Sequence, residues 1–219
     1  MINTVIFDLD GLLVNTEHTW YQVWNDLLGM FGKSFTLEDY VSNYSGKTVV
    51  DNTSLLIKNY DLPIDTETGV AHANQIEKRY IIAGVELMEG AKELLDYLKE
   101  HNFKIVVGTS SHKDRATKIL EGTNVLSYFD DIVVGYDVKR GKPFPDTFLE
   151  AARRVDASAE HCLVLEDSEM GIQAAHAADM KVICIPDLKE PSKPYADMTT
   201  AILPTLGHVI EYLKQENMM

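Results

Sequence analysis

Acidic side chains, hydroxyls and a lysine stand after the apolar runs of this sequence, in positions that suit catalysis. Asp8 and Asp10 close the run Thr4–Phe7. Because they are two residues apart, their side chains share one face of an extended chain. Such a pair can divide the work of a reaction, one carboxylate attacking while the other moves protons. The pair alone is weak evidence, since acidic pairs at strand ends also bind metals or cap the next turn.

Three later places add polar groups of a similar kind. Thr109 and Ser110 follow a second apolar run, where a hydroxyl and successive N–H groups could hold a phosphate at a helix start. Lys142 lies in a proline-rich turn, and Glu166 and Asp167 follow a later run. Each place has an ordinary explanation: an N-cap, a solvated lysine, or acids at the positive end of a helix. Those explanations do not account for the whole set, which runs along the chain as an acid pair, a hydroxyl, a lysine and a second acid pair.

The runs that precede these groups are short and rich in β-forming residues. They are Thr4–Phe7, Phe103–Val107, Cys162–Leu165, Val182–Ile185 and the weaker Ile132–Val134. Runs that are apolar on both faces suit strands buried on both sides. Helical patterns alternate with them, over Ala91–His101, Pro145–Val155 and Gly171–Ala178. The alternation predicts a parallel sheet wrapped by helices, with the chemistry at the carboxyl ends of its strands.

One interval between the predicted strands is unusually long. About ninety residues separate the first strand from the second, whereas a crossover needs about a dozen. The interval is helical: it contains a one-faced pattern from Trp20 to Leu28, a capping box of Thr36 with Asp39, and helical stretches over Val49–Tyr60 and Thr66–Ile82. We therefore predict a core of residues 1–14 and 86–219 and an inserted helical cap domain, or lid, of residues 15–85.

The composition limits the partners of this chain. Its 219 residues include 20 basic and 34 acidic ones, a formal net charge of −14, which disfavours nucleic acid and anionic membranes. A small anionic substrate would need a local positive charge. Cys162 and Cys184 lie in apolar runs and are expected to be reduced thiols. No segment approaches the roughly 20 apolar residues of a membrane span, so we expect a cytoplasmic protein. We also expect a monomer or a weak dimer.

Taken together, these groups resemble a known family. The segments Asp8-Leu9-Asp10-Gly11, Thr109-Ser110, Lys142 and Glu166-Asp167 match, in order, the four motifs of haloacid dehalogenase-type phosphatases. The surrounding residues are similar to the subgroup of β-phosphoglucomutase, 2-deoxyglucose-6-phosphate phosphatase and pseudouridine-5′-phosphatase. The resemblance implies an α/β fold, a Rossmann-like doubly wound parallel sheet with a helical cap inserted after the first motif. It also implies hydrolysis of a small phosphorylated metabolite.

The resemblance assigns a role to each motif. Asp8 would attack phosphorus to give an aspartyl phosphate, and Asp10 would protonate the leaving group and then activate water. Mg²⁺ would be held by Asp8, the Asp10 carbonyl and Asp167, with Glu166 close by. Lys142 would steady both Asp8 and the transferring group.

Two further contacts to the substrate follow from the same resemblance. Thr109 and the Ser110 N–H would hold phosphate oxygens. The loop Gly46-Lys47-Thr48 resembles the cap loop of the sugar-phosphate and pseudouridine phosphatases, which makes Lys47 a candidate substrate contact. An exposed loop lysine without such a role explains it equally well.

Three other functions are compatible with the same scaffold. In β-phosphoglucomutase a cap histidine and a cap arginine grip a bisphosphate, but Trp20 and Val49 stand at those positions here, which disfavours a mutase. A dehalogenase does not need Asp10, because a halide leaves without a proton. A catalytically idle binding or regulatory protein usually lacks an acid or the lysine, and this chain keeps them all.

Overall fold

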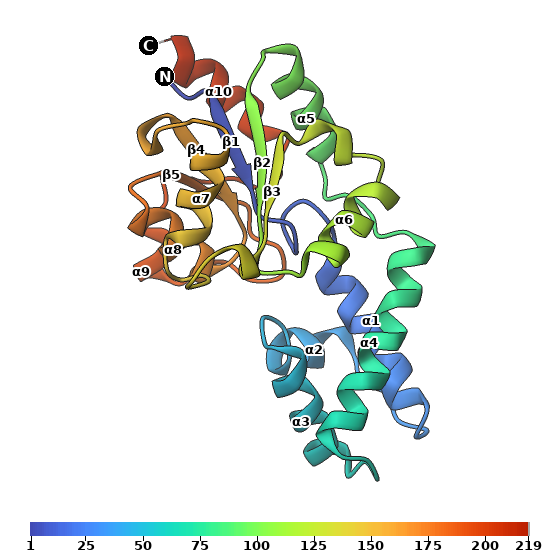
Figure 1. Cartoon of the computed structure of the whole chain (residues 1–219). Coiled ribbons are helices and arrows are strands. Elements are labelled where there is room, and N and C mark those ends of the chain that lie inside the picture. The colour runs from blue at the N-terminus through green and yellow to red at the C-terminus, as the bar shows by residue number, and fades with distance from the viewer. Residues whose placement is uncertain (219) are drawn as a thin grey trace. The chain divides into compact units, whose positions relative to one another are not determined.

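Six parallel strands form a single sheet in the computed structural model, which describes residues 1–218 (Figure 1). The strands are β1 (Thr4–Phe7), β2 (Lys104–Gly108), β3 (Asp131–Val133), β4 (Cys162–Glu166), β5 (Lys181–Cys184) and β6 (Ala201–Ile202). Their order is β3-β2-β1-β4-β5-β6, so the chain adds strands to one side of β1 and then to the other. The predicted doubly wound parallel sheet is confirmed. In such sheets ligands bind outside the carboxyl ends of the strands, where the order reverses.

The register of β1 with its two neighbours brings three strand ends into line. Phe7 pairs with Val107 of β2 on one side and with Leu165 of β4 on the other. The residues that follow these partners therefore emerge together at one edge of the sheet. Those residues include Asp8 and Glu166, which lie far apart in the sequence.

Helices cover both faces of this sheet. They are α5 (Ala91–Glu100), α6 (Lys113–Gly122), α7 (Asp146–Arg154), α8 (Glu169–Ala177), α9 (Lys193–Ala196) and α10 (His208–Met218), with short 3₁₀ turns at Leu126–Tyr128, Gly135–Asp137 and Ala159–His161. On one face, Ile6 of β1 packs in a core with Phe148 of α7 and Ile172 of α8. Val5 and Phe7 point to the opposite face, because strand residues alternate, and they are also fully buried.

The chain divides into two compact units, Met1–Asn15 with Glu86–Met219, and Thr16–Val85. Within the first unit the two connecting segments pair with each other: Asn15 N donates to Glu86 O over 2.9 Å, and Met88 N donates to Leu13 O over 3.0 Å. The chain therefore leaves and re-enters the sheet-containing unit along a single pair of neighbouring segments.

The second unit is entirely helical among its regular elements. It contains α1 (Thr16–Gly29), α2 (Leu37–Asn43), α3 (Val49–Tyr60) and α4 (Thr66–Ala83), with α4 packed against both α1 and α3. The Thr36–Asp39 capping box predicted from the sequence opens α2. Trp24 and Leu28 of α1 are buried on its apolar face. These helices thus bury a small core of their own.

Two sequence expectations about composition can be compared with this structure. Cys162 and Cys184 are both free and buried, as expected of structural thiols, and burial raises their pKa values to about 11 and about 12. Across residues 1–218 none of the helices has the length and apolar character that a membrane crossing requires.

Candidate active site

The predicted catalytic groups of the sheet-containing unit gather at the carboxyl edge of the sheet. Asp8 directly follows β1, Thr109 directly follows β2, and Glu166 is the last residue of β4. Lys142 lies in the connection between β3 and α7, in the proline-rich turn noted in the sequence. Its long side chain reaches the other groups, and a buried cluster of Asp8, Lys142, Glu166 and Asp167 results.

Lys142 joins two acidic groups of the buried cluster. Its Nζ lies 2.5 Å from Asp8 Oδ1 and 2.5 Å from Glu166 Oε1. The side chains of Lys142, Asp8 and Glu166 are only 7%, 10% and 0% exposed, so water screens these charges little. The lysine therefore sits at a fixed place beside the predicted nucleophile.

Glu166 is held by protein donors through both of its oxygens. Lys142 occupies Oε1, while Oε2 accepts hydrogen bonds from Asp167 N at 3.0 Å, from Ser168 N at 2.9 Å and from the Ser168 hydroxyl at 2.9 Å. Gly171 makes room for this carboxylate, since a Cβ there would overlap it. These contacts fix Glu166 as an anchor for Lys142 and for the start of α8.

Burial and mutual repulsion shift the charges of the buried cluster. Burial raises the pKa of Asp8 to about 7, with the charges of Glu166 and Asp10 adding to the shift and Lys142 opposing it. Burial and the charges of Glu166 and Asp8 raise the pKa of Asp167 well above its usual range. Burial acts to lower the pKa of Lys142, but Asp8 and Glu166 outweigh it and raise that pKa. Three acids thus share one lysine, and a second cation would be favoured here.

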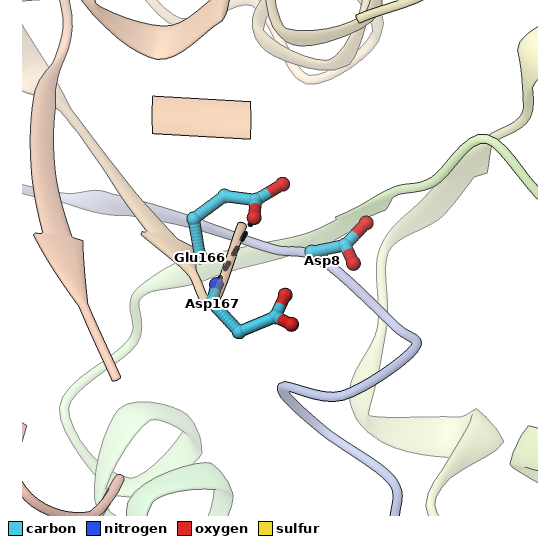
Figure 2. A group of neighbouring side chains, drawn as sticks. All are labelled: Asp8, Glu166 and Asp167. Carbon is cyan, nitrogen blue, oxygen red and sulfur yellow. Dashed lines mark hydrogen bonds between the residues drawn. The ribbon is translucent and has the colours of Figure 1, made fainter. Parts of the chain in front are cut away.

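Three carboxylates of the buried cluster could hold that second cation. Figure 2 shows Asp8, Glu166 and Asp167 around one point, and each offers an oxygen within 4.8 Å of the other two. Asp167 Oδ1 is buried and has no hydrogen-bond partner in the protein. Unpaired hard oxygen donors of this kind suit Mg²⁺. The residues present therefore fit the predicted metal, with Asp167 the most available of them; the Asp10 carbonyl stays a prediction as its ligand.

Gly11 lets the chain pass close to this group. It has a φ of +79°, a conformation that residues with a side chain rarely adopt. A Cβ at Gly11 would lie 2.5 Å from Asp167 Oδ2. The glycine that follows the Asp-x-Asp pair thus meets both a backbone and a spatial requirement.

Thr109 and Ser110 occupy the turn between β2 and α6. Thr109 is 1% exposed, and its hydroxyl accepts a hydrogen bond from Ser111 N over 3.0 Å. Ser110 is exposed at the same turn, just before the N-terminus of α6. The structure thus places both residues at the sheet edge where a phosphate site was predicted; their roles stay predictions.

Asp10 has two partners that the sequence analysis did not single out. Arg115 Nη1 lies 2.8 Å from Asp10 Oδ1, and the Ser111 hydroxyl donates to Oδ2 over 2.7 Å. The available signal was a Ser and an Arg four residues apart at a helix start, with Ser111 just before the N-cap and Arg115 in the first turn. Nothing local connected that pair with a residue 105 positions away. We call Asp10, Ser111 and Arg115 the Asp10 cluster.

Lys47 belongs to the helical unit and is exposed in the loop between α2 and α3. Its Nζ donates to the Asn43 carbonyl oxygen over 2.6 Å. The next residue, Thr48, caps α3 through its side chain. A substrate contact by Lys47 remains a prediction.

Comparison with known proteins identifies the class. The chain matches the family model of haloacid dehalogenase-like hydrolases over residues 5–185 and belongs to that family. The match extends from β1, which leads into Asp8, to the segment just after β5. The family predicted from the four motifs is therefore confirmed.

Individual relatives agree with the predicted subgroup. The chain is 28% identical over 182 residues to a phosphorylated carbohydrates phosphatase of Thermotoga maritima, covering 83% of this chain and 84% of that one. It is 32% identical over 188 residues to a probable pseudouridine-5′-phosphatase of Drosophila melanogaster, covering 83% and 80%. A bifunctional riboflavin kinase/FMN phosphatase of Arabidopsis thaliana is 31% identical, and the chain spans 52% of it. These relatives confirm the predicted enzyme class, phosphoric monoester hydrolase.

A solved structure shows the same fold. The β-phosphoglucomutase of Clostridium difficile superposes with a TM-score of 0.75 at 21% identity, covering 99% of this chain and 97% of the other. At that identity the match concerns the fold.

Proposed function

We propose that this chain is a magnesium-dependent phosphatase that hydrolyses a small phosphomonoester, such as a sugar phosphate, through an aspartyl phosphate on Asp8. The observation that carries the proposal is the contact between Lys142 Nζ and Asp8 Oδ1, 2.5 Å apart in a buried site. A nucleophile needs an oriented, ionised oxygen, and a fixed ammonium beside a carboxylate supplies both orientation and charge. The family and its phosphatase members support the assignment.

Two aspartates divide the proposed reaction. Asp8 attacks phosphorus, the bond to the leaving oxygen breaks, and Asp10 gives that oxygen a proton. A water then gives a proton to Asp10 and attacks the phosphorus of the aspartyl phosphate. The bond between phosphorus and the Asp8 oxygen breaks, which releases inorganic phosphate and restores the Asp8 carboxylate. The placement of Asp8 within the buried cluster and of Asp10 outside it supports this division of roles.

Charge repulsion must be offset before Asp8 can attack. Two unit like charges 4 Å apart repel by about 4 kcal/mol at an effective dielectric of about 20. Lys142 contributes one compensating charge, anchored by Glu166. A Mg²⁺ ion held by Asp8 and Asp167, with the Asp10 carbonyl as the third predicted ligand, would neutralise phosphate charge in the transition state.

The phosphate and the rest of the substrate need further contacts. Thr109 and the Ser110 N–H, beside the positive end of α6, are the proposed ligands of phosphate oxygens. We assign Thr16–Val85 as a cap that excludes water during the reaction, with Lys47 as its proposed substrate contact. Relatives that act on phosphorylated carbohydrates or carry the name pseudouridine-5′-phosphatase support a small phosphorylated metabolite as substrate.

A substrate screen tests this proposal. The purified protein is incubated with phosphorylated sugars, nucleotides and polyols in excess Mg²⁺, and inorganic phosphate is measured together with kcat/KM for each hit. The Asp8→Asn variant, purified in the same way, controls for contaminating phosphatases. Phosphate release that requires metal and is absent from the variant supports the proposal. Release no greater than the variant's would contradict it and favour an idle binding protein.

A mutase is the alternative within the family, because the fold matches a β-phosphoglucomutase. A mutase must grip and turn a bisphosphate, a task for cationic groups on its cap. Trp20 stacks on Trp24, with ring centroids 5.3 Å apart, and Val49 opens α3; neither supplies charge. We therefore expect glucose 1-phosphate, primed with a bisphosphate, to yield little glucose 6-phosphate in a coupled dehydrogenase assay. Isomerisation faster than phosphate release would establish the mutase instead.

A further inference from the structure

The carboxylate of Asp10 is held by side chains from the start of α6. Arg115 Nη1 lies 2.8 Å and 2.9 Å from the two Asp10 oxygens, and it also donates to the Ser111 hydroxyl over 2.6 Å. That hydroxyl in turn donates to Asp10 Oδ2 over 2.7 Å. These four hydrogen bonds join all three residues to one another. This arrangement fixes where the two oxygens of Asp10 lie.

The main chain around Asp10 is already fixed without Arg115. Gly11 N donates to Val14 O over 3.0 Å, and Val14 N donates to Leu9 O over 3.1 Å, which closes the turn after β1. What these bonds leave open are the two side-chain torsions of Asp10. Arg115 and Ser111 act on those torsions through their contacts with the carboxylate.

Helix stability does not explain an arginine at this position. Arg115 lies in the first turn of α6, whose N-cap is His112. Partial positive charge at a helix N-terminus favours anions and disfavours a cation there by a few tenths of a kcal/mol or more. Asp114 already places one anion in that turn, and the Asp10 carboxylate, from the turn after β1, supplies a partner for Arg115. The arginine is therefore explained by its contact with Asp10 at the carboxyl edge of the sheet, and not by stabilisation of α6.

The exposure of the pair also indicates a role other than stability. The side chains of Arg115 and Asp10 are 18% and 32% exposed, against 7% and 10% for Lys142 and Asp8. Partly exposed ion pairs contribute little to stability, because water screens them. An arginine is, however, well suited to orienting a group that exchanges protons, since a guanidinium keeps its charge and does not compete for the proton.

We propose that Arg115, assisted by Ser111, is a positioning residue that holds the Asp10 carboxylate where it exchanges protons with the leaving group and with water. The inference rests on the proposed function, because it needs Asp10 as the acid and base. Rotation of Asp10 away from this place would slow both proton transfers while leaving Asp8 intact.

The test compares two substrates with different leaving groups. The sugar phosphate with the highest kcat/KM in the screen needs a proton on its leaving alkoxide, whereas 4-nitrophenyl phosphate releases a stable anion without one. For Arg115→Met we expect kcat for the sugar phosphate to fall about 10²-fold, within the usual range for general acid–base catalysis, with KM changed less than threefold. With 4-nitrophenyl phosphate we expect a stoichiometric burst of 4-nitrophenolate followed by slow turnover, because only dephosphorylation is impaired.

Matched variants separate positioning from other roles. Arg115→Lys should recover part of the lost kcat, since it keeps a cation that reaches Asp10 less well. Arg153→Met, which removes an exposed arginine paired with Glu150, should leave the kinetics unchanged. In an Asp10→Asn background, Arg115→Met should cost less than a further twofold, because it acts through Asp10. Ser111→Ala should lower kcat about threefold to tenfold, and it carries the test if Arg115→Met fails to fold.

Defined results would overturn the inference. An unchanged kcat in Arg115→Met or, if that variant does not fold, in Ser111→Ala would do so. So would a tenfold rise in KM at constant kcat, which indicates direct substrate binding, or a full additional loss in the Asp10→Asn background. Failure of the proposed function looks different: the wild type would release no phosphate, or Asp10→Asn would retain full activity, and the inference would fall with it.

Discussion

The two aspartates of the Asp-x-Asp pair lie two residues apart in very different surroundings. Asp8 belongs to the buried cluster, where it is 10% exposed and contacts Lys142. Asp10 belongs to the Asp10 cluster, where it is 32% exposed and contacts Arg115. Each acid faces a cation, but burial makes uncompensated charge costly only in the first cluster.

The difference matches the tasks proposed for the two groups. A nucleophile must keep one place and one charge, which a water-poor site with a fixed lysine provides. A proton carrier must change its charge in each turnover, and partial exposure lowers the cost of that change. Environments that differ between neighbouring carboxylates are therefore expected where one attacks and the other shuttles protons.

Removal of the nucleophile, one of the two aspartates compared, should have the largest effect on activity. Asp8→Asn is expected to lower kcat by about 10⁴-fold or more, because an amide oxygen cannot attack phosphorus and loss of such a group is rarely compensated. Phosphate release measures the activity, and circular dichroism checks the fold. Asp197→Asn, which alters an exposed partner of Lys193, is the control. A folded Asp8→Asn variant with a large share of activity would exclude the covalent route.

Lys142→Met should destabilise the protein through the buried cluster. The change leaves Asp8 and Glu166 without their cation, and breaking a buried pair costs about 3–5 kcal/mol. Urea unfolding of metal-free protein at pH 8 would measure this loss. Lys139→Met, at an exposed position of the same loop, should change the free energy of unfolding by less than about 0.5 kcal/mol. Equal free energies of unfolding for the two variants would show that Asp8 and Glu166 do not need the charge of Lys142 for stability.

Metal removal tests whether the buried cluster needs a second cation. Excess EDTA should abolish turnover and Mg²⁺ should restore it. Asp167→Ala should raise the half-saturating Mg²⁺ concentration at least about 10- to 100-fold, the cost found for partners of metal ligands. Asp187→Ala, a nearby acid outside the three-carboxylate group, is the matched control and should shift it less. Full turnover in EDTA would remove the metal from the mechanism.

Gly11→Ala should have the smallest effect on activity. It should act on the buried cluster by displacing Asp167. A positive φ costs an alanine about 1–2 kcal/mol, and its Cβ would also press on Asp167 Oδ2. Gly46→Ala provides the control, because Gly46 has a φ of +73° and nothing within 4 Å of a Cβ. Both variants should lose similar stability in thermal melts, but only Gly11→Ala should need more Mg²⁺. An equal Mg²⁺ requirement would show that Asp167 moves aside freely.

Much of the core fold could be read from short segments of sequence. The run Thr4–Phe7 forms β1 with the predicted bounds, and Val49–Tyr60 forms α3 as predicted. Short elements were missed: β6 has two residues and α9 has four, too few for a periodic pattern. The helix α10 was missed as well. A periodic pattern of apolar residues reflects local burial, so it identifies only elements long enough for the pattern to repeat.

The sequence by itself determined which chemical groups the candidate site would contain. Asp8, Asp10, Lys142 and Asp167 were identifiable because residue type and order along the chain carry that information. Only the tertiary structure decided which cation faces which acid. Arg115 meets Asp10 because β2, which leads into α6, pairs with β1, and that pairing joins segments far apart in the sequence. Burial in that sheet likewise raises the pKa of Asp8 to about 7, since a charge's energy depends on the surroundings that distant segments provide.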